Sequence, residues 1–425
     1  MIKRNLYSEL KQHLTAREMT LVVGPRQSGK TTLLRLLAKE LEKTDKNVLF
    51  LNLDVEADAH HFQSQQHLIR KIELEFGSAR EGFVFIDEIQ RKENAGIFLK
   101  GLYDQMLPYK FIVSGSGSLE LKEKIQESLA GRKRLFELSP VTFDEFVHYQ
   151  TEYKYADNFS QFVKIERERL NFLLIEYMNF GGYPRIVTES DAREKYLLID
   201  EIFRSYVEKD LVYLLHIDRP EVYRQLIRLL ANQTGKLVNF SKLAANLNVS
   251  LPTVKKYIWF AQKTFIIDMI TPFARNFKKE ITRSPMTYFW DLGLCLFSLG
   301  RFGGLLADAA PGFLFQNFVY NLVKQKCNSF SGMLHFWRTT DHAEVDLVLE
   351  RGNDLVPIEI KFSNFSKPVI GRSLRSFISK YNPQQAWVVN LNFFAQIQVA
   401  ETNVRFIPYY QLLLPDFWSD IPNSI

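Results

Sequence analysis

The sequence predicts an α/β protein whose N-terminal part is built around a parallel sheet. Over the first 150 residues, short apolar runs alternate with helix-like stretches, which is typical of βαβ units. These runs are continuously apolar, as in strands covered on both faces. A second series of strand patterns occupies the last hundred residues. At 425 residues the chain exceeds what one hydrophobic core usually organises, so we expect several domains.

The N-terminal elements follow in order along the chain. We expect strands over residues 20–23, 48–53, 83–86 and 111–113, and a helix over residues 30–42 with leucines at 33, 34, 36, 37 and 41. From about residue 150 the pattern becomes helical, and residues 192–215 form a long, charged, amphipathic stretch. We therefore predict a sheet domain over residues 1–150 and a helical lid or connector over residues 151–225.

Residues 24–31, Gly-Pro-Arg-Gln-Ser-Gly-Lys-Thr, match the phosphate-binding pattern G-x-x-x-x-G-K-S/T between a predicted strand and a predicted helix. Gly24 and Gly29 allow a tight turn with inward N–H groups, and the helix that begins at Lys30 adds its positive end. Lys30 supplies a charge for the β- and γ-phosphates, and the Thr31 hydroxyl suits Mg²⁺. The predicted nucleotide-binding residues are Gly24, Pro25, Arg26, Gln27, Ser28, Gly29, Lys30, Thr31 and Thr32.

Two acids directly follow the strand predicted over residues 83–86. The carboxyl ends of parallel strands lie together on one side of the sheet, and the phosphate-binding loop lies on that same side. Asp87 is therefore predicted to hold the water shell of Mg²⁺, and Glu88 to polarise the attacking water. A surface acidic pair is the alternative, but solubility explains poorly why two acids follow four apolar residues.

Further polar residues are candidates for the same site. Ser114 follows the strand at 111–113, where its hydroxyl would lie between the phosphates and Glu88 as a γ-phosphate sensor; a polar turn is the alternative. Arg132 is a candidate to stabilise transition-state charge, in cis or from a neighbouring subunit, against a solvated basic loop as the alternative. Arg4 and Leu6 precede the first strand at a distance suited to adenine contact.

Seven sequence segments carry a specific resemblance: GPRQSGKTT, FIDEIQ, SGSGS, the Gly-Arg pair before ELSPVTFDEF, FGGYPR, YFWDLGL, and the EVD and IEIK pair. Together they resemble AAA-family ATPases fused to a C-terminal domain of unknown function, DUF4143, over nearly the whole chain. The resemblance implies a P-loop AAA-type domain, a winged helix-turn-helix over residues 226–295 and a restriction-endonuclease-like α/β domain over residues 296–425. It implies ATP and Mg²⁺ as ligands, with Lys30, Thr31, Asp87 and Glu88 in the roles given above.

Residues 236–262 predict two short helices around a turn, with Ser250 as N-cap and Pro252 at the first helical position of the second helix. In a helix-turn-helix, the second helix enters the major groove. Modules of this kind also bind proteins, so DNA and a protein partner both stay open. The expected packing face is Leu243, Leu247, Val254 and Ile258. The expected exposed face is Thr253, Lys255, Lys256 and Tyr257, with Lys255 and Lys256 as candidate phosphate contacts.

The C-terminal part predicts a helix over residues 313–326 and strands over residues 335–338, 344–350, 355–362 and 386–390. The tetrapeptide at residues 351–354 resembles a turn, and counting outward from it places Asp346 opposite Glu359. Opposed like charges destabilise a ladder, so we expect a positive group between them, either Lys361 or a divalent metal.

Asp346, Glu359 and Lys361 resemble the D…E-x-K core of metal-dependent restriction-type nucleases, in which the carboxylates bind Mg²⁺ and the lysine helps to activate water. Such families often have a glutamate on the preceding helix. This chain has Gln316 there, a poorer magnesium ligand, and Glu344 is a candidate to compensate. DNA cleavage is therefore an open alternative to an ion-pair patch or a binding platform.

Composition and charge limit the classes of protein to which this chain can belong. Two cysteines, Cys295 and Cys327, build neither a disulfide framework nor a four-ligand zinc site, so we interpret them as reduced thiols of a cytoplasmic protein. No stretch approaches the ~20 apolar residues of a membrane span, and a net charge of +6 permits nucleic-acid binding without requiring it.

Three functional hypotheses follow from these observations. The leading one is an ATP-hydrolysing switch that couples nucleotide state to binding of DNA or a partner. The alternatives are an ATP-regulated, metal-dependent nuclease and a scaffold or signalling ATPase that binds protein. Self-association is left open.

Overall fold

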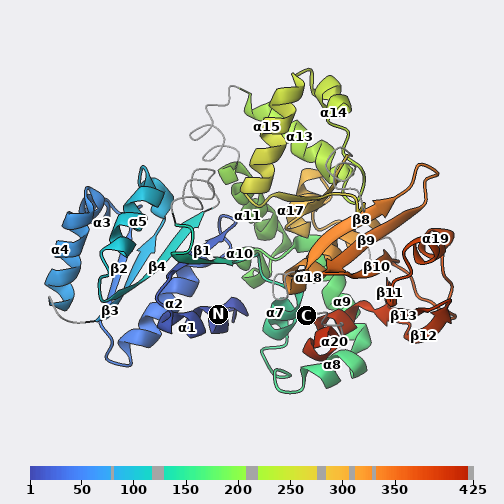
Figure 1. The fold of residues 1–425 in the computed structure, drawn as a ribbon, viewed down its shortest axis with the longest axis horizontal. Coiled ribbons are helices and arrows are strands. Elements are labelled where there is room, and N and C mark those ends of the chain that lie inside the picture. Colours follow the sequence, from blue (N-terminus) through green and yellow to red (C-terminus); the bar gives the residue numbers. More distant parts are fainter. Residues whose placement is uncertain are drawn as a thin grey trace.

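The computed structural model describes residues 1–77, 81–116, 129–206, 219–274, 284–305, 312–327 and 332–419. Figure 1 shows the N-terminal sheet and its helices on one side of the molecule and the C-terminal sheet on the other, with helices α10 and α11 between them. Helices α13, α14 and α15 lie together at the top of the same view.

The N-terminal sheet is parallel and contains five strands in the order β2-β3-β4-β1-β5. Its strands are β1 (Met19–Gly24), β2 (Val48–Asn52), β3 (Gly82–Asp87), β4 (Tyr109–Ser116) and β5 (Lys133–Glu137). The four predicted strands are confirmed. Strand β5 occupies part of the segment for which a basic loop was the alternative, and its charged residues are typical of an edge strand.

Helices cover both faces of this sheet. They are α1 (Leu6–Gln12), α2 (Lys30–Glu42), α3 (Glu56–Ala59), α4 (Gln65–Phe76) and α5 (Ala95–Asp104), with short 3₁₀ turns η1 (His13–Thr15), η2 (His60–Phe62) and η3 (Ile89–Arg91). Alternate strand residues face opposite layers because of the two-residue period of a strand. Val22 and Phe85 pack toward α1 and α2, whereas Val23 and Val84 pack toward α4 and α5.

The next part of the chain is helical, as predicted. Its helices are α7 (Phe143–Gln150), α8 (Phe159–Ile165), α9 (Arg167–Phe180), α10 (Pro184–Thr188), α11 (Ala192–Ser205) and α13 (Pro220–Asn232). Helix α11 covers the first part of the stretch predicted over residues 192–215. The remainder of that stretch, from residue 207, lies outside the described residues.

The two short helices predicted near residues 236–262 are α14 (Phe240–Leu247) and α15 (Leu251–Lys263), and a hairpin of β6 (Ile267–Ile270) and β7 (Met286–Phe289) follows, before α17 (Leu292–Ser298). The Ser250 hydroxyl accepts the Thr253 N–H as an N-cap, and Pro252 is the second helical residue instead of the first. The predicted packing face is buried. Tyr257 is also buried, which corrects its assignment to the exposed face: its ring packs edge-on against Tyr223 of α13.

The C-terminal sheet is mixed and has the order β12-β13-β11-β10-β9-β8. Its strands are β8 (Met333–Arg338), β9 (Glu344–Arg351), β10 (Asp354–Ile360), β11 (Gln385–Asn390), β12 (Ala395–Val399) and β13 (Thr402–Pro408), and its helical elements are α18 (Gly312–Cys327), α19 (Arg372–Tyr381), η6 (Tyr409–Leu413) and α20 (Pro415–Ser419). The β9–β10 register agrees with the predicted count, since Glu350 pairs with Leu355. The turn is tighter than expected, because Arg351 also pairs with Asp354 and leaves a two-residue loop with Gly352 at φ 59°.

One apolar cluster runs from Val141 to Phe417 and joins the helical segments to one face of the C-terminal sheet. Phe143 of α7 packs edge-on against Phe318 of α18 at 5.2 Å between ring centroids, and the Tyr409 hydroxyl donates to Asn171 of α9 at 2.9 Å. The helices from α7 to α18 therefore share one core with that face of the sheet, whereas α19 packs in a second cluster on the opposite face. Within the described ranges, none of the helices has both the length and the apolar character that a bilayer crossing requires.

Candidate nucleotide site

The loop between β1 and α2 has the backbone that its two glycines permit. Gly29 is the residue before α2 and has φ 94°, a left-handed conformation that suits glycine. A Cβ on Gly24 would stand 2.2 Å from the Leu138 carbonyl oxygen, so only glycine fits there. Gln27 has φ 57°, a conformation that is uncommon for residues other than glycine and recurs at binding sites.

Polar groups inside this loop are arranged to suit a phosphate group. The Lys30 ammonium is buried and donates to the carbonyl oxygens of Gly24 at 3.1 Å and Pro25 at 2.7 Å. The Ser28 hydroxyl is buried without a hydrogen-bond partner among the described residues. A phosphate group offers acceptors to both side chains. The residues present therefore fit a nucleotide phosphate.

The two predicted metal ligands, Thr31 at the start of α2 and Asp87 at the end of β3, are in contact. The Thr31 hydroxyl donates to Asp87 Oδ2 at 2.7 Å, and Asp87, at the carboxyl end of β3, is fully buried. The Ser114 hydroxyl donates to the other oxygen, Asp87 Oδ1. Ser114 thus bonds to Asp87 and not to Glu88, which corrects its predicted position between the phosphates and Glu88. A hydroxyl and a carboxylate side by side fit Mg²⁺, which prefers oxygen ligands.

Glu88 lies directly beyond this pair in a strained backbone conformation, with φ 57° and ψ 41°. Burial raises the pKa of Glu88, the nearby Lys30 charge lowers it in part, and the Asp87 carboxylate raises it further. The Gln90 side-chain amide donates to Glu88 Oε2. A carboxylate with a raised pKa binds a proton more tightly, which suits a general base.

Arg4 anchors the phosphate-binding loop from the N-terminal segment. Its guanidinium donates to the Ser28 carbonyl at 2.8 Å and to the Ser139 carbonyl at 2.6 Å, and it forms a 2.8 Å ion pair with Glu145 of α7. The side chains of this pair are 7% and 3% exposed. Leu6 packs among the apolar residues of α1 and α2. Adenine contact by Arg4 or Leu6 stays a prediction.

Arg132 lies near the start of β1, at the opposite end of the strands from the phosphate-binding loop. Its carbonyl accepts the Met19 N–H at the start of β1, and its guanidinium pairs with Asp104 at 2.7 Å. The phosphate-binding loop leaves the opposite end of β1, about 16 Å away for a strand of this length. The geometry therefore disfavours action in cis, which leaves action from a neighbouring subunit and a solvated basic residue as the two alternatives.

Sequence reasoning missed a contact between the loop and α10. Pro184 Cγ lies 3.7 Å from the position that a Cβ on Gly29 would take. Arg185 Nη1 donates to Gln27 Oε1 at 3.3 Å and to both carboxylate oxygens of Glu201 on α11 at 3.0 Å. The segment FGGYPR contains this arginine, but nothing local in the sequence shows that it folds back onto a loop about 160 residues earlier.

The FGGYPR segment is also hydrogen-bonded to Asp291 at the start of α17. The Asp291 carboxylate accepts the N–H of Gly182 at 2.7 Å and the N–H of Leu294 at 2.8 Å. A Cβ on Gly181 would stand 2.3 Å from Asp291 Oδ1. The segments FGGYPR and YFWDLGL therefore meet here, and a continuous set of contacts leads from α17 through Gly182 to Arg185 and the loop.

Asp291 is expected to impose a pH dependence on stability. Burial raises the pKa of Asp291 to about 6, although its backbone N–H donors lower it. The folded protein therefore binds the proton more tightly than the unfolded chain does, so this contribution to stability is present at low pH and is lost as pH rises through 6. The pKa of Asp291 is about two above the ordinary aspartate value, which corresponds to a contribution of about 3 kcal/mol at most to the free energy of unfolding.

Thermal unfolding of the wild type and of Asp291→Asn between pH 4 and 7.5 measures this effect. The wild type should lose stability relative to the variant as pH rises, because the variant has no proton to release. Parallel curves for the two proteins would show that Asp291 keeps an ordinary pKa.

The C-terminal hairpin holds the second group of predicted residues. Asp346 Oδ2 accepts the Ile360 N–H at 2.7 Å, and burial raises the pKa of Asp346 to about 6. Lys361 Nζ lies 3.0 Å from Glu359 Oε1, as the charge argument predicted. Burial lowers the pKa of Lys361, but Glu359 and Asp346 outweigh it, so the pKa is raised overall.

The two residues that bear on metal binding at the hairpin have other partners. The Gln316 amide donates to the Tyr288 hydroxyl at 3.0 Å, and Glu344 pairs with Arg338 at 2.9 Å. Compensation by Glu344 for the missing glutamate would therefore require that it leave Arg338. Two carboxylates, Asp346 and Glu359, remain as predicted metal ligands.

Helix α15 presents the predicted DNA-contacting lysines to solvent. Lys255 and Lys256 are exposed. The Thr253 hydroxyl is hydrogen-bonded to the Ser250 hydroxyl at 2.8 Å, so it already has a partner within the helix cap. The two ammonium groups are the side chains of this helix that suit phosphate contact.

Three family matches divide the chain. Residues 16–147 match an AAA domain. Residues 171–303 match a domain of unknown function, DUF8612. Residues 311–412 match a domain of unknown function, DUF4143. The suspected combination of an N-terminal AAA domain with a C-terminal DUF4143 domain is confirmed.

Relatives extend across most of the chain. An uncharacterized protein of Mycobacterium tuberculosis is 28% identical over 377 residues, which are 88% of this chain and 76% of the relative. An uncharacterized protein of Haemophilus influenzae is 24% identical over 372 residues, which are 85% of this chain and 87% of the relative. Among solved structures, the replication initiator DnaA bound to AMPPCP and single-stranded DNA aligns at 15% identity with a TM-score of 0.31, over 62% of this chain and 90% of that one.

Proposed function

The chain joins an N-terminal AAA domain to a C-terminal DUF4143 domain, and from this premise we propose that it is an ATP-hydrolysing switch whose nucleotide state controls the binding of DNA. One observation carries the proposal. The Thr31 hydroxyl and the buried Asp87 carboxylate are in contact beside a loop that holds a buried lysine and a buried serine hydroxyl with no hydrogen-bond partner in the described parts of the chain.

Each side chain of the site has a role in this proposal. Lys30 would exchange its two carbonyl partners for phosphate oxygens, and Thr31 and Asp87 would hold Mg²⁺. Bound ATP with Mg²⁺ would supply the phosphoanhydride bond that is cleaved. Glu88 would orient a water molecule and take its proton.

Arg185 would link the nucleotide to the rest of the chain. Its present partners are Gln27, a half-buried residue of the loop, and Glu201 on α11; the Arg185 and Glu201 side chains are 53% and 57% exposed. Exposed pairs of this kind contribute little stability, so a γ-phosphate can compete for the guanidinium. A shift of Arg185 would move α10 and, through Gly182 and Asp291, the start of α17.

DNA is the proposed partner because α15 presents Lys255 and Lys256 on the second helix of a helix-turn-helix pair. We do not extend the proposal to DNA cleavage. Gln316 is bonded to Tyr288 and Glu344 to Arg338, so no third carboxylate joins Asp346 and Glu359 in the described part of the hairpin site.

Measuring DNA affinity at increasing salt concentration tests whether DNA is the partner. Replacing Lys255 and Lys256 by alanine is expected to flatten the slope of log K against log salt by about two, since each phosphate contact on duplex DNA contributes about 0.9. The matched control replaces two exposed lysines, Lys39 of α2 and Lys43 directly after it, and should keep the wild-type slope. Absence of salt-dependent DNA binding in the wild type would instead favour the scaffold ATPase that binds protein.

The coupling is measured in the same assay with and without a non-hydrolysable ATP analogue. Arg185→Ala should reduce the ratio of the two DNA affinities to about one and leave the affinity without nucleotide unchanged. Arg193→Ala, which removes an exposed arginine from α11, should keep the wild-type ratio. An unchanged ratio in Arg185→Ala would remove Arg185 from the coupling.

A further inference from the structure

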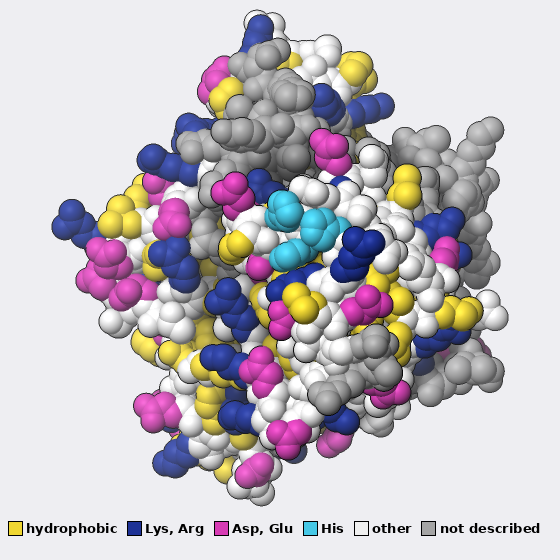
Figure 2. All heavy atoms as spheres, turned by 90° about the vertical axis from the view of Figure 1, so that its left-hand side faces the viewer, with side chains coloured by type: hydrophobic (Ala, Val, Ile, Leu, Met, Phe, Trp, Pro, Cys, Tyr) yellow, Lys and Arg dark blue, Asp and Glu magenta, His cyan; other side chains and the backbone are white. Residues whose placement is uncertain are grey.

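Three of the eight histidines of the chain gather on the outer surface of the AAA domain, away from the phosphate-binding loop. His60 and His61 belong to η2, and His67 lies in the first turns of α4. Figure 2 shows the three imidazoles as one group on this face, with lysine and arginine side chains beside it. None of these residues takes part in the proposed ATPase site.

Buried neighbours hold both backbone segments in place. Phe62, the last residue of η2, is 2% exposed, and its ring lies 5.8 Å from the ring of Phe98 on α5. Ser64 caps α4, because its hydroxyl accepts the His67 N–H at 3.1 Å. Leu68 and Ile69, the next residues of α4, are buried in the same core. The three imidazoles therefore project from a rigid corner.

The imidazole nitrogens are close enough to share one ion. One ring nitrogen from each histidine lies within 4.8 Å of those of the other two. The ring of His67 is 5.1 Å from that of His60 and 5.7 Å from that of His61, between centroids. Nitrogens bound to Zn²⁺ at 2.0–2.1 Å in tetrahedral geometry are about 3.3 Å apart. Side-chain rotations that bring them closer by at most about 1.5 Å would complete such a set.

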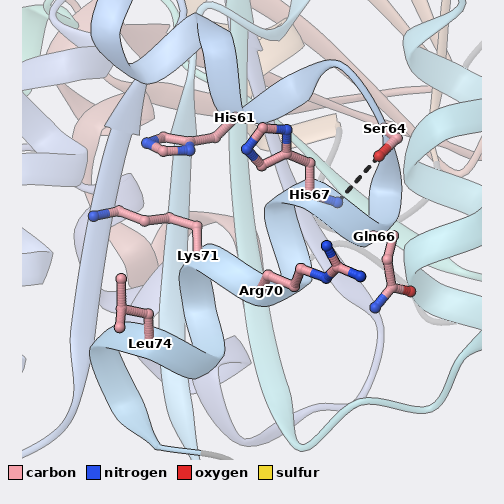
Figure 3. A pocket seen from close by; sticks show the side chains of 7 residues that line it. All are labelled: His61, Ser64, Gln66, His67, Arg70, Lys71 and Leu74. Atoms are coloured by element: carbon pink, nitrogen blue, oxygen red, sulfur yellow. Dashed lines mark hydrogen bonds between the residues drawn. The ribbon is translucent and has the colours of Figure 1, made fainter.

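Two observations point to a ligand at this cluster. The Nδ1 atom of His61 is buried and has no hydrogen-bond partner among the described residues. A hollow of about 450 Å³ adjoins the cluster and is lined by His61, Ser64, Gln66, His67, Arg70, Lys71 and Leu74. Figure 3 shows the His61 and His67 rings side by side above α4.

We propose that His60, His61 and His67 form a binding site for a divalent transition-metal ion, zinc in the first place, with a fourth coordination position open to the hollow. Imidazole nitrogens suit zinc, nickel and copper, whereas Mg²⁺ prefers oxygen ligands. The site therefore differs in chemistry from the one formed by Thr31 and Asp87. Three histidines leave one position of a tetrahedral ion free for an exogenous ligand.

The surroundings indicate which fourth ligand would be favoured. Arg70 and Lys71 line the hollow, and the Lys71 ammonium pairs with Glu75 at 2.5 Å. The positive charge of Arg70 and Lys71 disfavours a bare cation, and a negatively charged ligand on the metal would offset that cost. An anion such as hydroxide or a carboxylate is therefore the ligand class that the site would take.

Cobalt titration of the full-length protein tests this site. The protein is prepared without a histidine tag, freed of metal with a chelator and kept in excess Mg²⁺, which fills oxygen-ligand sites. We expect one Co²⁺ per chain with the intense visible absorption of a tetrahedral ion, and we expect Zn²⁺ to displace it. His61→Ala and His67→Ala should each weaken Co²⁺ binding at least tenfold, whereas His342→Ala, at an exposed histidine outside the cluster, should not.

Circular dichroism and ATP binding of each variant separate loss of the site from loss of folding. His67→Gln replaces the ring by a neutral amide of similar polarity and should weaken Co²⁺ binding in a fully folded protein. Absence of tetrahedral absorption in the wild type would overturn the proposal, and so would equal binding by wild type and His67→Ala. Binding of inorganic phosphate to the metal-free protein, without any tetrahedral Co²⁺ signal, would identify the hollow as an anion site and also overturn it.

Discussion

Glu88→Gln is expected to slow ATP hydrolysis by about two to four orders of magnitude while ATP stays bound. Glutamine keeps the size and polarity of the side chain but cannot take a proton. The raised pKa of Glu88, caused by burial, is the property that this substitution removes. Steady-state phosphate release measures the rate, and retention of labelled ATP through gel filtration measures the trapped complex.

Two controls define the role of Glu88. Glu93→Gln changes an exposed carboxylate five residues further on and should hydrolyse ATP at the wild-type rate. Lys30→Ala should bind no ATP, because the ammonium between the Gly24 and Pro25 carbonyls is then missing. Wild-type hydrolysis by Glu88→Gln would exclude Glu88 as the general base, and tight ATP binding by Lys30→Ala would contradict the proposed phosphate site.

Arg4→Ala is expected to destabilise the protein by about 3–5 kcal/mol and to weaken ATP binding. The substitution leaves the Glu145 carboxylate buried without its cation and frees the Ser28 carbonyl of the phosphate-binding loop. Burial raises the pKa of Glu145, and Arg4 lowers it in part, so the carboxylate depends on this partner for its charge. Thermal unfolding and ATP calorimetry on the same samples measure both effects.

A double variant distinguishes the two roles of Arg4. Arg4→Met with Glu145→Leu removes both charges and fills the space with apolar groups, so much of the stability should return while ATP binding stays weak. Lys11→Ala, at an exposed ion pair of the same N-terminal segment, should leave both properties unchanged. Full ATP affinity in the double variant would show that Arg4 does not position the loop.

Local patterns predicted the elements of this protein well. The strands of the parallel sheet were recognisable because consecutive residues such as Val84 and Phe85 are buried on opposite faces of the sheet and leave continuous apolar runs. The register of the C-terminal hairpin followed from counting alone, since any even loop length keeps Glu350 opposite Leu355. Strand β5 was harder to predict, because an edge strand carries charged residues such as Lys133 and Arg134 that also suit a loop.

Side-chain partners were predicted less well than elements. Ser114 was placed at the correct end of its strand, but its hydrogen bond to Asp87 was not predicted, because a strand pattern does not show which polar group a hydroxyl there contacts. Tyr257 was assigned to the exposed face of α15, although α13, more than 20 residues earlier, covers that side of the helix. Arg132 lies next to a glycine in a basic segment, which suggested a role at the nucleotide. Only the pairing of β5 with β1 shows that Arg132 lies at the end of β1 opposite the phosphate-binding loop.

The amino-acid sequence by itself determined the phosphate-binding loop, the acids that follow β3 and the order of helices and strands, since each depends on residues adjacent in the chain. The tertiary structure alone decided that Arg185 reaches Gln27 and that Asp291 joins Gly182. Those contacts join residues more than 100 positions apart, and their energies depend on packing among segments that no local periodicity describes. The contacts that join the phosphate-binding loop to α10 and α17 are therefore set by the tertiary structure.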